Sequence, residues 1–183
     1  MTADLVAEFT NARDAITPRH QAALRAAGIP TILVDVWGLF GVSSVEVYGE
    51  HYQPAPEGPI AFIAPIRGGF SLEHPDPIGL VLFGDIIDLL CWHPGRPDRW
   101  ALRLGSATAL GAYPPQLLQP PRVRVHATPL GWFRSGATGL CLLTRRHREI
   151  QSILLSLQHI VADDPAHRRH LCEICRLPSL LRR

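Results

Sequence analysis

Four potential metal ligands lie close together near the C-terminus, in the segment HRRHLCEIC. The segment contains His167, His170, Cys172 and Cys175, side-chain types that bind zinc in proteins. If the segment is one helix, His167 and Cys175 are about 12 Å apart along its axis, which is too far for one tetrahedral ion. We therefore predict no metal and no other cofactor, and keep Cys172, Cys175 and His170 as the alternative.

Two acidic pairs are candidates for magnesium-dependent phosphodiester chemistry. Asp85 and Asp88 share a face if their segment is helical. Asp163 and Asp164 end a predicted strand and resemble the acidic pair of magnesium-binding primase and topoisomerase lobes. The glutamate that should end the preceding strand in those lobes is replaced here by Thr144 and Arg145. The sequence therefore assigns no catalytic residue, and a magnesium-dependent nuclease or degenerate primase-type lobe stays an alternative.

The chain contains no lysine, so all 18 basic residues are arginines. Arginine stays charged at any working pH, which excludes catalysis through a covalent or deprotonated lysine. The lysine-containing phosphate loop is absent as well, and so are the motifs GxGxxG, HExxH and GxSxG. These absences argue against an ordinary ATPase, kinase, zinc protease or α/β-hydrolase, and we favour a protein without enzymatic activity.

Charge is divided unevenly along the chain. Up to Cys91 there are four arginines against eleven acidic residues, a net charge of −7. After Cys91 there are fourteen arginines against five acidic residues, a net charge of +9. Three interpretations follow: the two parts neutralise each other across their interface, the basic part binds a polyanion through its guanidinium groups, or it binds an acidic protein surface.

The predicted binding residues are mostly arginines of the basic part. If Thr144 caps a helix, Arg145, Arg146 and Arg148 lie in its first turn, where unpaired amides and guanidinium groups together favour an anion. Aromatic rings near these arginines either stack on a base or belong to the core. They are Trp92, Trp100, Trp132 and Phe133. The predicted nucleic-acid or anion site comprises Arg122, Arg124, Trp132, Arg134, Arg145, Arg146 and Arg148.

The spacing of hydrophobic residues, together with the positions of glycine, proline and helix-capping residues, predicts the elements that carry these residues. Residues 1–28 read as a helical hairpin, with caps at Thr2 and Thr17 and a stop at Gly28. A β-rich part follows, and 85–92 within it suits a helix as well as a strand. Its predicted strands are 31–37, 42–49, 59–67, 78–92 and 100–105. After a proline-rich connector at 112–121, strands are predicted at 122–126, 139–144 and 159–163, alternating with helices at 128–136, 145–157 and 164–177.

These elements predict an α+β fold. It comprises an N-terminal helical hairpin, a central and mostly antiparallel sheet, and a C-terminal βαβα lobe. The corresponding divisions are 1–28, a β-rich acidic lobe at 29–111 and an arginine-rich α/β lobe at 112–183, together forming one compact unit. No apolar run is long enough for a membrane span, and the first residues lack a secretion signal. We expect a cytoplasmic protein whose four cysteines are reduced thiols.

A stretch from about Thr31 to Arg176 resembles a group of small bacterial prophage and mobile-element proteins. The strings that carry the resemblance are GDIIDLLCWHPGRPDRWALRLG, TPLGWFRSGATGLCLLTR and IVADDPAH. The resemblance implies a phage or mobile-element setting and assigns no activity. Together with the charge distribution it predicts a non-enzymatic accessory protein that binds nucleic acid, DNA in preference to RNA, through phosphates. The alternative is an inhibitor or adaptor that binds an acidic surface of a host or phage protein complex.

Overall fold

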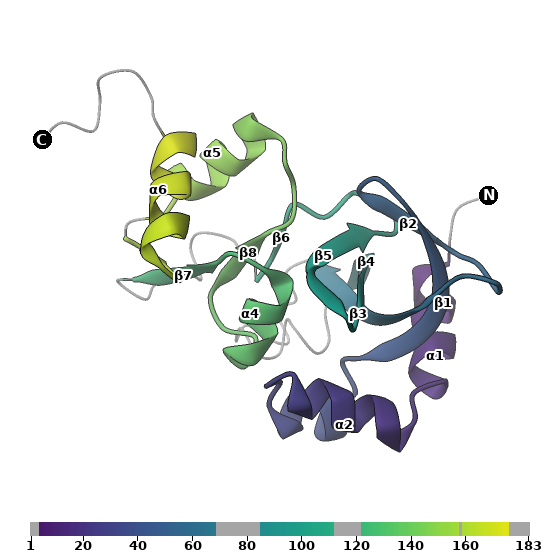
Figure 1. The fold of residues 1–183 in the computed structure, drawn as a ribbon. Helices are drawn as coiled ribbons and strands as arrows, with labels where there is room; N and C mark the ends of the chain where they lie inside the picture. The colour runs from purple at the N-terminus through teal and green to yellow at the C-terminus, as the bar shows by residue number, and fades with distance from the viewer. Residues whose placement is uncertain (1–3, 69–84, 112–121, 158, 176–183) are drawn as a thin grey trace, which may run out of the picture.

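The fold consists of a β-barrel and a second sheet, with helices around both (Figure 1). The computed structural model describes residues 4–68, 85–111, 122–157 and 159–175. The helices are α1 (Leu5–Asp14), α2 (Pro18–Ala26), the π-helical turn η1 (Ile32–Val36), α4 (Pro129–Arg134), α5 (His147–Leu155) and α6 (Pro165–Ile174). The strands are β1 (Gly41–Tyr48), β2 (His51–Pro54), β3 (Ile60–Gly68), β4 (Asp85–His93), β5 (Arg96–Leu102), β6 (Ala109–Leu110), β7 (Val123–His126), β8 (Leu140–Leu142) and β9 (Ile160–Ala162). The predicted α+β class is confirmed.

The N-terminal hairpin forms with local signals at its helix ends. Asp4 caps α1 by accepting the N–H of Ala7, whereas the predicted cap Thr2 lies outside the described residues. Thr17 caps α2 as predicted. Gly28 follows α2 with a φ of +86°, a left-handed conformation that glycine adopts without the steric cost of a Cβ.

The central sheet closes into a five-stranded barrel in the order β1-β2-β5-β4-β3. Most neighbours pair in antiparallel fashion, as predicted, and a parallel contact of His51 with Leu102 closes the ring. The segment 85–92, which suited either a helix or a strand, lies within strand β4. The interior cluster includes residues from every barrel strand and the apolar side of α1; its fully buried members include Val45, Tyr52, Ile63 and Leu89.

The prediction of a strand at 31–37 is wrong, because Ile32–Val36 forms a π-helical turn. The N–H of Leu33 and that of Val34 donate to the carbonyl of Pro30, and the Trp37 N–H reaches Ile32. Leu33 and Val34 are buried while the flanking apolar residues face solvent. A short apolar run does not distinguish a strand from a buried helical turn, and packing on one side selected the turn.

The second sheet has the strand order β6-β8-β7-β9. β7, β8 and β9 are parallel, and β6 joins β8 in antiparallel orientation. Helices α5 and α6 cover one face of this sheet, and α4 lies on the side of the barrel. The predicted caps Thr128 and Asp164 are confirmed, since each side chain accepts an N–H from the first turn of its helix.

A hydrophobic cluster distinct from the barrel interior bridges the barrel and the second sheet. Phe133 of α4 lies 4.9 Å from Phe40 and 5.6 Å from Trp92, measured between ring centroids. Trp132 completes this aromatic group from the side of the second sheet. The predicted connector at 112–121, which leads into β7, lies outside the described residues. Among the described helices, none has the length and apolar character needed to cross a membrane.

Candidate nucleic-acid interface

Asp88 fixes the loop that follows β5. Its Oδ1 accepts the N–H of Leu89 at 2.8 Å and that of Leu104 at 2.9 Å. Its Oδ2 accepts the N–H of Ser106 at 2.8 Å and that of Ala107 at 3.2 Å. The side chain is fully buried, so these four amides replace the water that would otherwise solvate the carboxylate.

This loop lines one of two adjoining clefts, which share Trp100 and Arg145. One, of about 480 Å³, includes Glu50 and the loop from Gly105 to Thr108 on the barrel side, and Arg146 on the side of the second sheet. The other, of about 610 Å³, includes the β4–β5 hairpin. We call the two together the junction cleft. Each has the size of a small-molecule or nucleotide site.

Four arginines line the junction cleft: Arg96, Arg99, Arg145 and Arg146. Arg96 and Arg99, on β5, are exposed, and neither makes an ion pair with a carboxylate in the described part of the chain. Arg145 pairs with Glu50 at 2.8 Å, although its side chain is 79% exposed. Arg146 pairs with Glu149 at 3.0 Å and is similarly exposed. Exposed ion pairs contribute only about 0–1 kcal/mol, so a phosphate can take the place of either carboxylate.

Three carboxylates line the same cleft and modulate its charge. Glu50 and Glu149 are held by the two ion pairs, and hydrogen bonds from Arg146 and Thr144 lower the pKa of Glu149. Asp98 is exposed on β5, between Arg96 and Arg99 in sequence. Unlike Glu50 and Glu149, it forms no ion pair with a described arginine.

The predicted anion site at the start of α5 does not form as expected. The helix begins at His147, and Arg146 occupies the cap position without a capping side-chain hydrogen bond. Arg145 precedes the helix and Arg148 alone of the three arginines lies in its first turn. Thr144 accepts the Arg146 N–H and donates to Glu149, so this threonine stabilises the turn before the helix instead of capping it.

Two other predicted site residues are committed to structural contacts. Trp132 is buried and donates from its indole nitrogen to the Gly139 carbonyl at 3.1 Å, so it presents no face for a base. Arg134 donates to the carbonyl of Ala27 at 2.6 Å, at the C-terminal end of α2. Trp132 is buried because α4 packs between the barrel and the second sheet, whereas Arg134 stays exposed, and its predicted role in binding an anion stays a prediction.

Arg122 and Arg124 belong to a different surface from Arg145. They stand before and within β7, and Arg145 follows β8, which runs parallel to β7 with Val125 opposite Leu140. Parallel order therefore places Arg122 and Arg145 at opposite ends of the sheet. The predicted set is split into two surfaces, and Arg145 and Arg146 are the members that line the junction cleft.

Trp100 and the two β5 arginines were not part of the predicted site. Of the four aromatic residues near arginines, Trp92, Trp132 and Phe133 are buried, and Trp100 is only half-buried. The local signal was the string RPDRW, which places Arg96 and Arg99 beside Trp100 in the chain. Only the closed barrel shows that this string faces Arg145.

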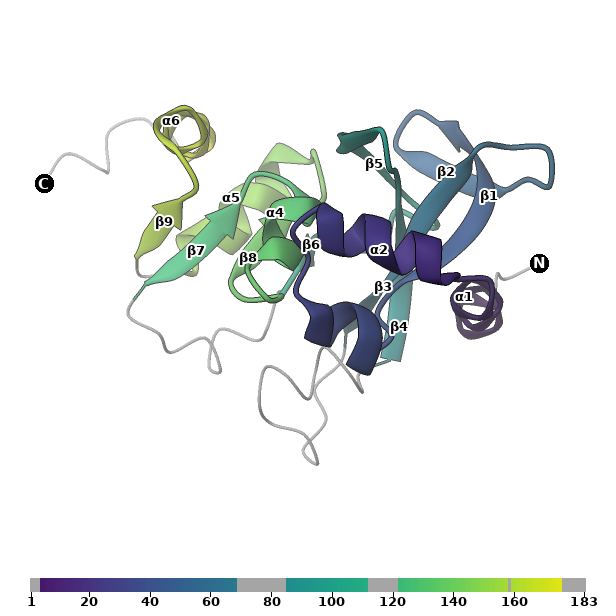
Figure 2. The same cartoon turned by 60° about the horizontal axis from the view of Figure 1, so that its bottom comes forward.

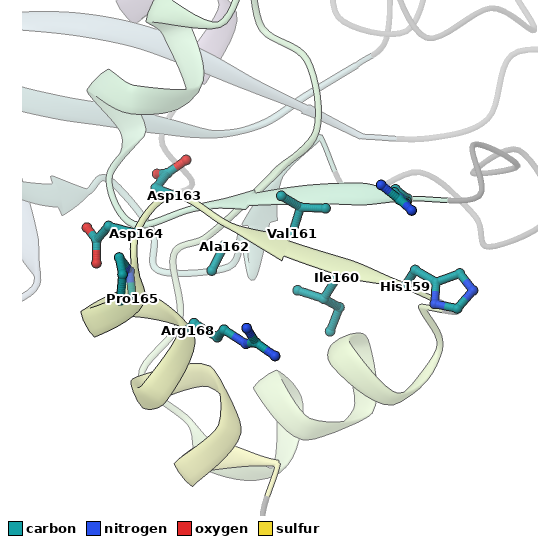
Figure 3. Close-up of a pocket in the computed structure, with 9 residues that line it drawn as sticks. His159, Ile160, Val161, Ala162, Asp163, Asp164, Pro165 and Arg168 are labelled. Atoms are coloured by element: carbon teal, nitrogen blue, oxygen red, sulfur yellow. The ribbon is translucent and has the colours of Figure 1, made fainter.

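A second surface is a groove along β9, shown in Figure 3. His159 lies at one end, Asp163 and Asp164 lie at the other, and Arg168 projects from α6 between them. Arg122 also lines this groove. Unlike the junction cleft, it is lined by no tryptophan, tyrosine or phenylalanine among the described residues.

Asp163 connects β9 to β7 at the carboxyl ends of these strands. Its Oδ1 lies 3.0 Å from Nδ1 of the buried His126, and its Oδ2 accepts the N–H of Ala127. His126 Nε2 lies 3.1 Å from the Thr138 carbonyl. Because both partners of the ring are acceptors, the ring donates through both nitrogens only in its protonated form.

The acidic pairs proposed for magnesium do not converge. Asp85 and Asp88 are on a strand, where residues three apart face opposite sides, and both Asp88 oxygens are bonded to amides. Asp164 caps α6, and this hydrogen bond to the His167 N–H lowers the pKa of Asp164. Among the described residues no three His, Cys, Asp or Glu side chains are arranged to hold a metal ion, and this includes Cys172, Cys175 and His170.

Few ion pairs connect the acidic and basic parts of the chain. In the described ranges, Glu8 with Arg103 and Glu50 with Arg145 are the ones that cross the division at Cys91. Most described arginines of the basic part therefore face solvent without a carboxylate partner within 4.0 Å. They are Arg96, Arg99, Arg122, Arg124, Arg134, Arg148, Arg168 and Arg169.

Comparisons of the chain with protein-family models, with curated proteins and with solved structures find no match.

Proposed function

We propose that the protein binds single-stranded nucleic acid, DNA in preference to RNA, in the junction cleft. The observation that carries this proposal is the position of Trp100, half-buried and lining both clefts, with Arg99 in one of them and Arg146 in the other. A base stacked on an aromatic ring contributes about 1–3 kcal/mol, and guanidinium groups on either side of the ring bind the adjoining phosphates. The bound strand would run across the boundary between the barrel and the second sheet. The resemblance to prophage proteins adds an accessory role in a mobile element to the proposal.

A nucleic acid fits this cleft better than an acidic protein surface does. Carboxylates on a folded partner would satisfy the arginines but would leave the ring of Trp100 without a stacking partner. Bases of a duplex are already stacked on one another, whereas an unpaired base is available to the ring. We therefore expect a single strand to bind more tightly than a duplex of the same sequence.

The test measures the affinity for a fluorescently labelled oligothymidylate over a range of salt concentrations. Each single-strand phosphate neutralised contributes a slope of about −0.7 to log K against log salt, so Arg99→Ala should flatten the slope by about that amount. Asp98→Asn removes a repelling carboxylate and should tighten binding. Arg19→Ala, which removes an exposed arginine on α2, is the matched control and should leave affinity and slope unchanged.

The role of Trp100 is tested separately. Trp100→Leu keeps an apolar side chain against the core but removes the ring, and should weaken binding by about 1–3 kcal/mol. Trp100→Phe restores a ring and should recover part of the affinity, which a purely structural role would not require. If Arg99→Ala leaves the salt slope unaltered, or if Trp100→Leu binds as tightly as the unmodified protein, the proposal is wrong.

A further inference from the structure

β9 is an edge strand whose outer side has hydrogen-bonding groups available. In the order β6-β8-β7-β9, no described strand pairs with the side of β9 that faces away from β7 (Figure 2). Val123 donates its N–H to the carbonyl of His159 at 2.8 Å, and Val161 stands opposite Arg124. Backbone groups alternate in direction along a strand, so those of Ile160 and Ala162 point outward. An exposed edge of this kind pairs readily with another strand.

The groove along this edge has the shape and composition of a strand-binding site. Its lining contains the consecutive residues 159–165, which includes the whole of β9. Ile160 is 37% exposed, and Val161 and Ala162 are half-buried, so the bottom of the groove is apolar. Strand addition uses main-chain hydrogen bonds for affinity and side-chain contacts on alternate residues for specificity.

The side-chain charges available in this groove are positive. The two carboxylates at one end of the groove already have partners. That of Asp163 lies beside the His126 ring and accepts the Ala127 N–H, and that of Asp164 accepts an N–H from the first turn of α6. Arg122 and Arg168 are exposed, and neither forms an ion pair with a described carboxylate. Figure 3 shows Arg168 reaching from α6 to the side of the strand where Ile160 lies. An incoming strand should therefore carry acidic residues toward the His159 end of the groove.

We propose that an extended acidic segment of a protein partner adds to β9 as a fifth strand of the second sheet. Its main chain pairs with Ile160 and Ala162, and its acidic side chains on the face that α6 covers contact Arg168. A nucleic acid suits this groove less well, because it offers no alternating N–H and C=O groups and meets two carboxylates at one end. This site is separate from the junction cleft and does not depend on it.

The probe is a short acetylated and amidated peptide of alternating glutamate and valine. Binding should protect the amide hydrogens of Ile160 and Ala162 from exchange with solvent, whereas that of Val161, which already faces β7, should change little. Two further peptides carry N-methyl groups on every second amide, one on the odd and one on the even positions. Only one of these two sets of amides faces β9, so one methylated peptide should lose binding and the other should keep it. Since a cross-strand charge pair contributes about 0.2–1 kcal/mol, Arg168→Ala should weaken binding up to about fivefold. Arg148→Ala, on α5, is the matched control.

Several outcomes would overturn this inference. Equal binding of a peptide of alternating lysine and valine would show that charge does not select the partner. Equal binding of both N-methylated peptides, or no protection of Ile160 and Ala162, would show that the peptide does not add as a strand. Protection that rises with protein concentration alone would assign the edge to a second copy of the chain. Protection by oligothymidylate would assign it to nucleic acid. Because the readout is at β9, loss of oligonucleotide binding at the junction cleft does not affect the result.

Discussion

Asp88→Asn should destabilise the fold by about 3–6 kcal/mol. Each oxygen of the buried carboxylate accepts two backbone N–H groups. Asparagine has one side-chain oxygen in place of two. Whichever way its amide is turned, two of the four hydrogen bonds are lost, and its NH₂ group faces the two backbone N–H groups that donated them. Hydrogen bonds to a charged group contribute about 1.5–3 kcal/mol each, which gives the range for two. Domains of this size have about 5–15 kcal/mol of stability in total, so the expected loss is a large part of it.

Urea unfolding, followed by circular dichroism, measures this change. The midpoint should fall while the dependence on urea concentration stays the same, as expected for a change in stability alone. Asp98→Asn is the matched control, because Asp98 is exposed, and it should shift stability by less than about 0.5 kcal/mol. If Asp88→Asn does not fold, Ser106→Ala serves instead. Its hydroxyl lies 2.9 Å from the Ile87 carbonyl and 3.2 Å from Asp88, and its loss should cost about 1 kcal/mol. An Asp88→Asn protein within 1 kcal/mol of the unmodified chain would refute the hydrogen-bond reasoning.

Three further predictions concern protonation, thiol reactivity and helix capping. Burial lowers the pKa of His167, so the midpoint of its NMR titration should lie below about 6.5. The native state therefore binds this proton less readily than the unfolded chain, and the free energy of unfolding should decrease as the pH is lowered through this window. The decrease should be smaller in His167→Gln. Burial raises the pKa of Cys91 to about 12 and also raises that of Cys141, so iodoacetamide should label the exposed Cys172 first, and equally fast native labelling of Cys141 by mass spectrometry would contradict its burial. Thr128→Ala removes the cap of α4 and should cost about 1 kcal/mol in thermal unfolding, whereas Thr128→Ser should cost little.

The sequence predicted the helix boundaries best where a polar cap precedes proline. Thr17, Thr128 and Asp164 each stand directly before a proline and each caps its helix. These signals are local, since the cap accepts an N–H only three residues ahead. Thr144 lacked a following proline, and there the predicted cap was wrong because its hydroxyl bonds to Arg146 and Glu149.

The candidate site was less predictable, because it depends on contacts between distant segments. Closure of the barrel places the hairpin that carries Arg96 and Trp100 beside the turn that carries Arg145. Packing of α4 buried Trp132, and the parallel order of β7 and β8 separated Arg122 from Arg145. None of these contacts between distant segments can be predicted from the spacing of residues along the chain.

The sequence by itself determined the composition of the two charged parts, the absence of lysine chemistry and the α+β class. These properties follow from residue types and from patterns within a few positions. Tertiary structure alone decided that the barrel closes, which arginines share a surface with Trp100, and that β9 is left at an edge. Those outcomes depend on long-range strand pairing and on which apolar faces bury one another, and each requires residues far apart in sequence to meet.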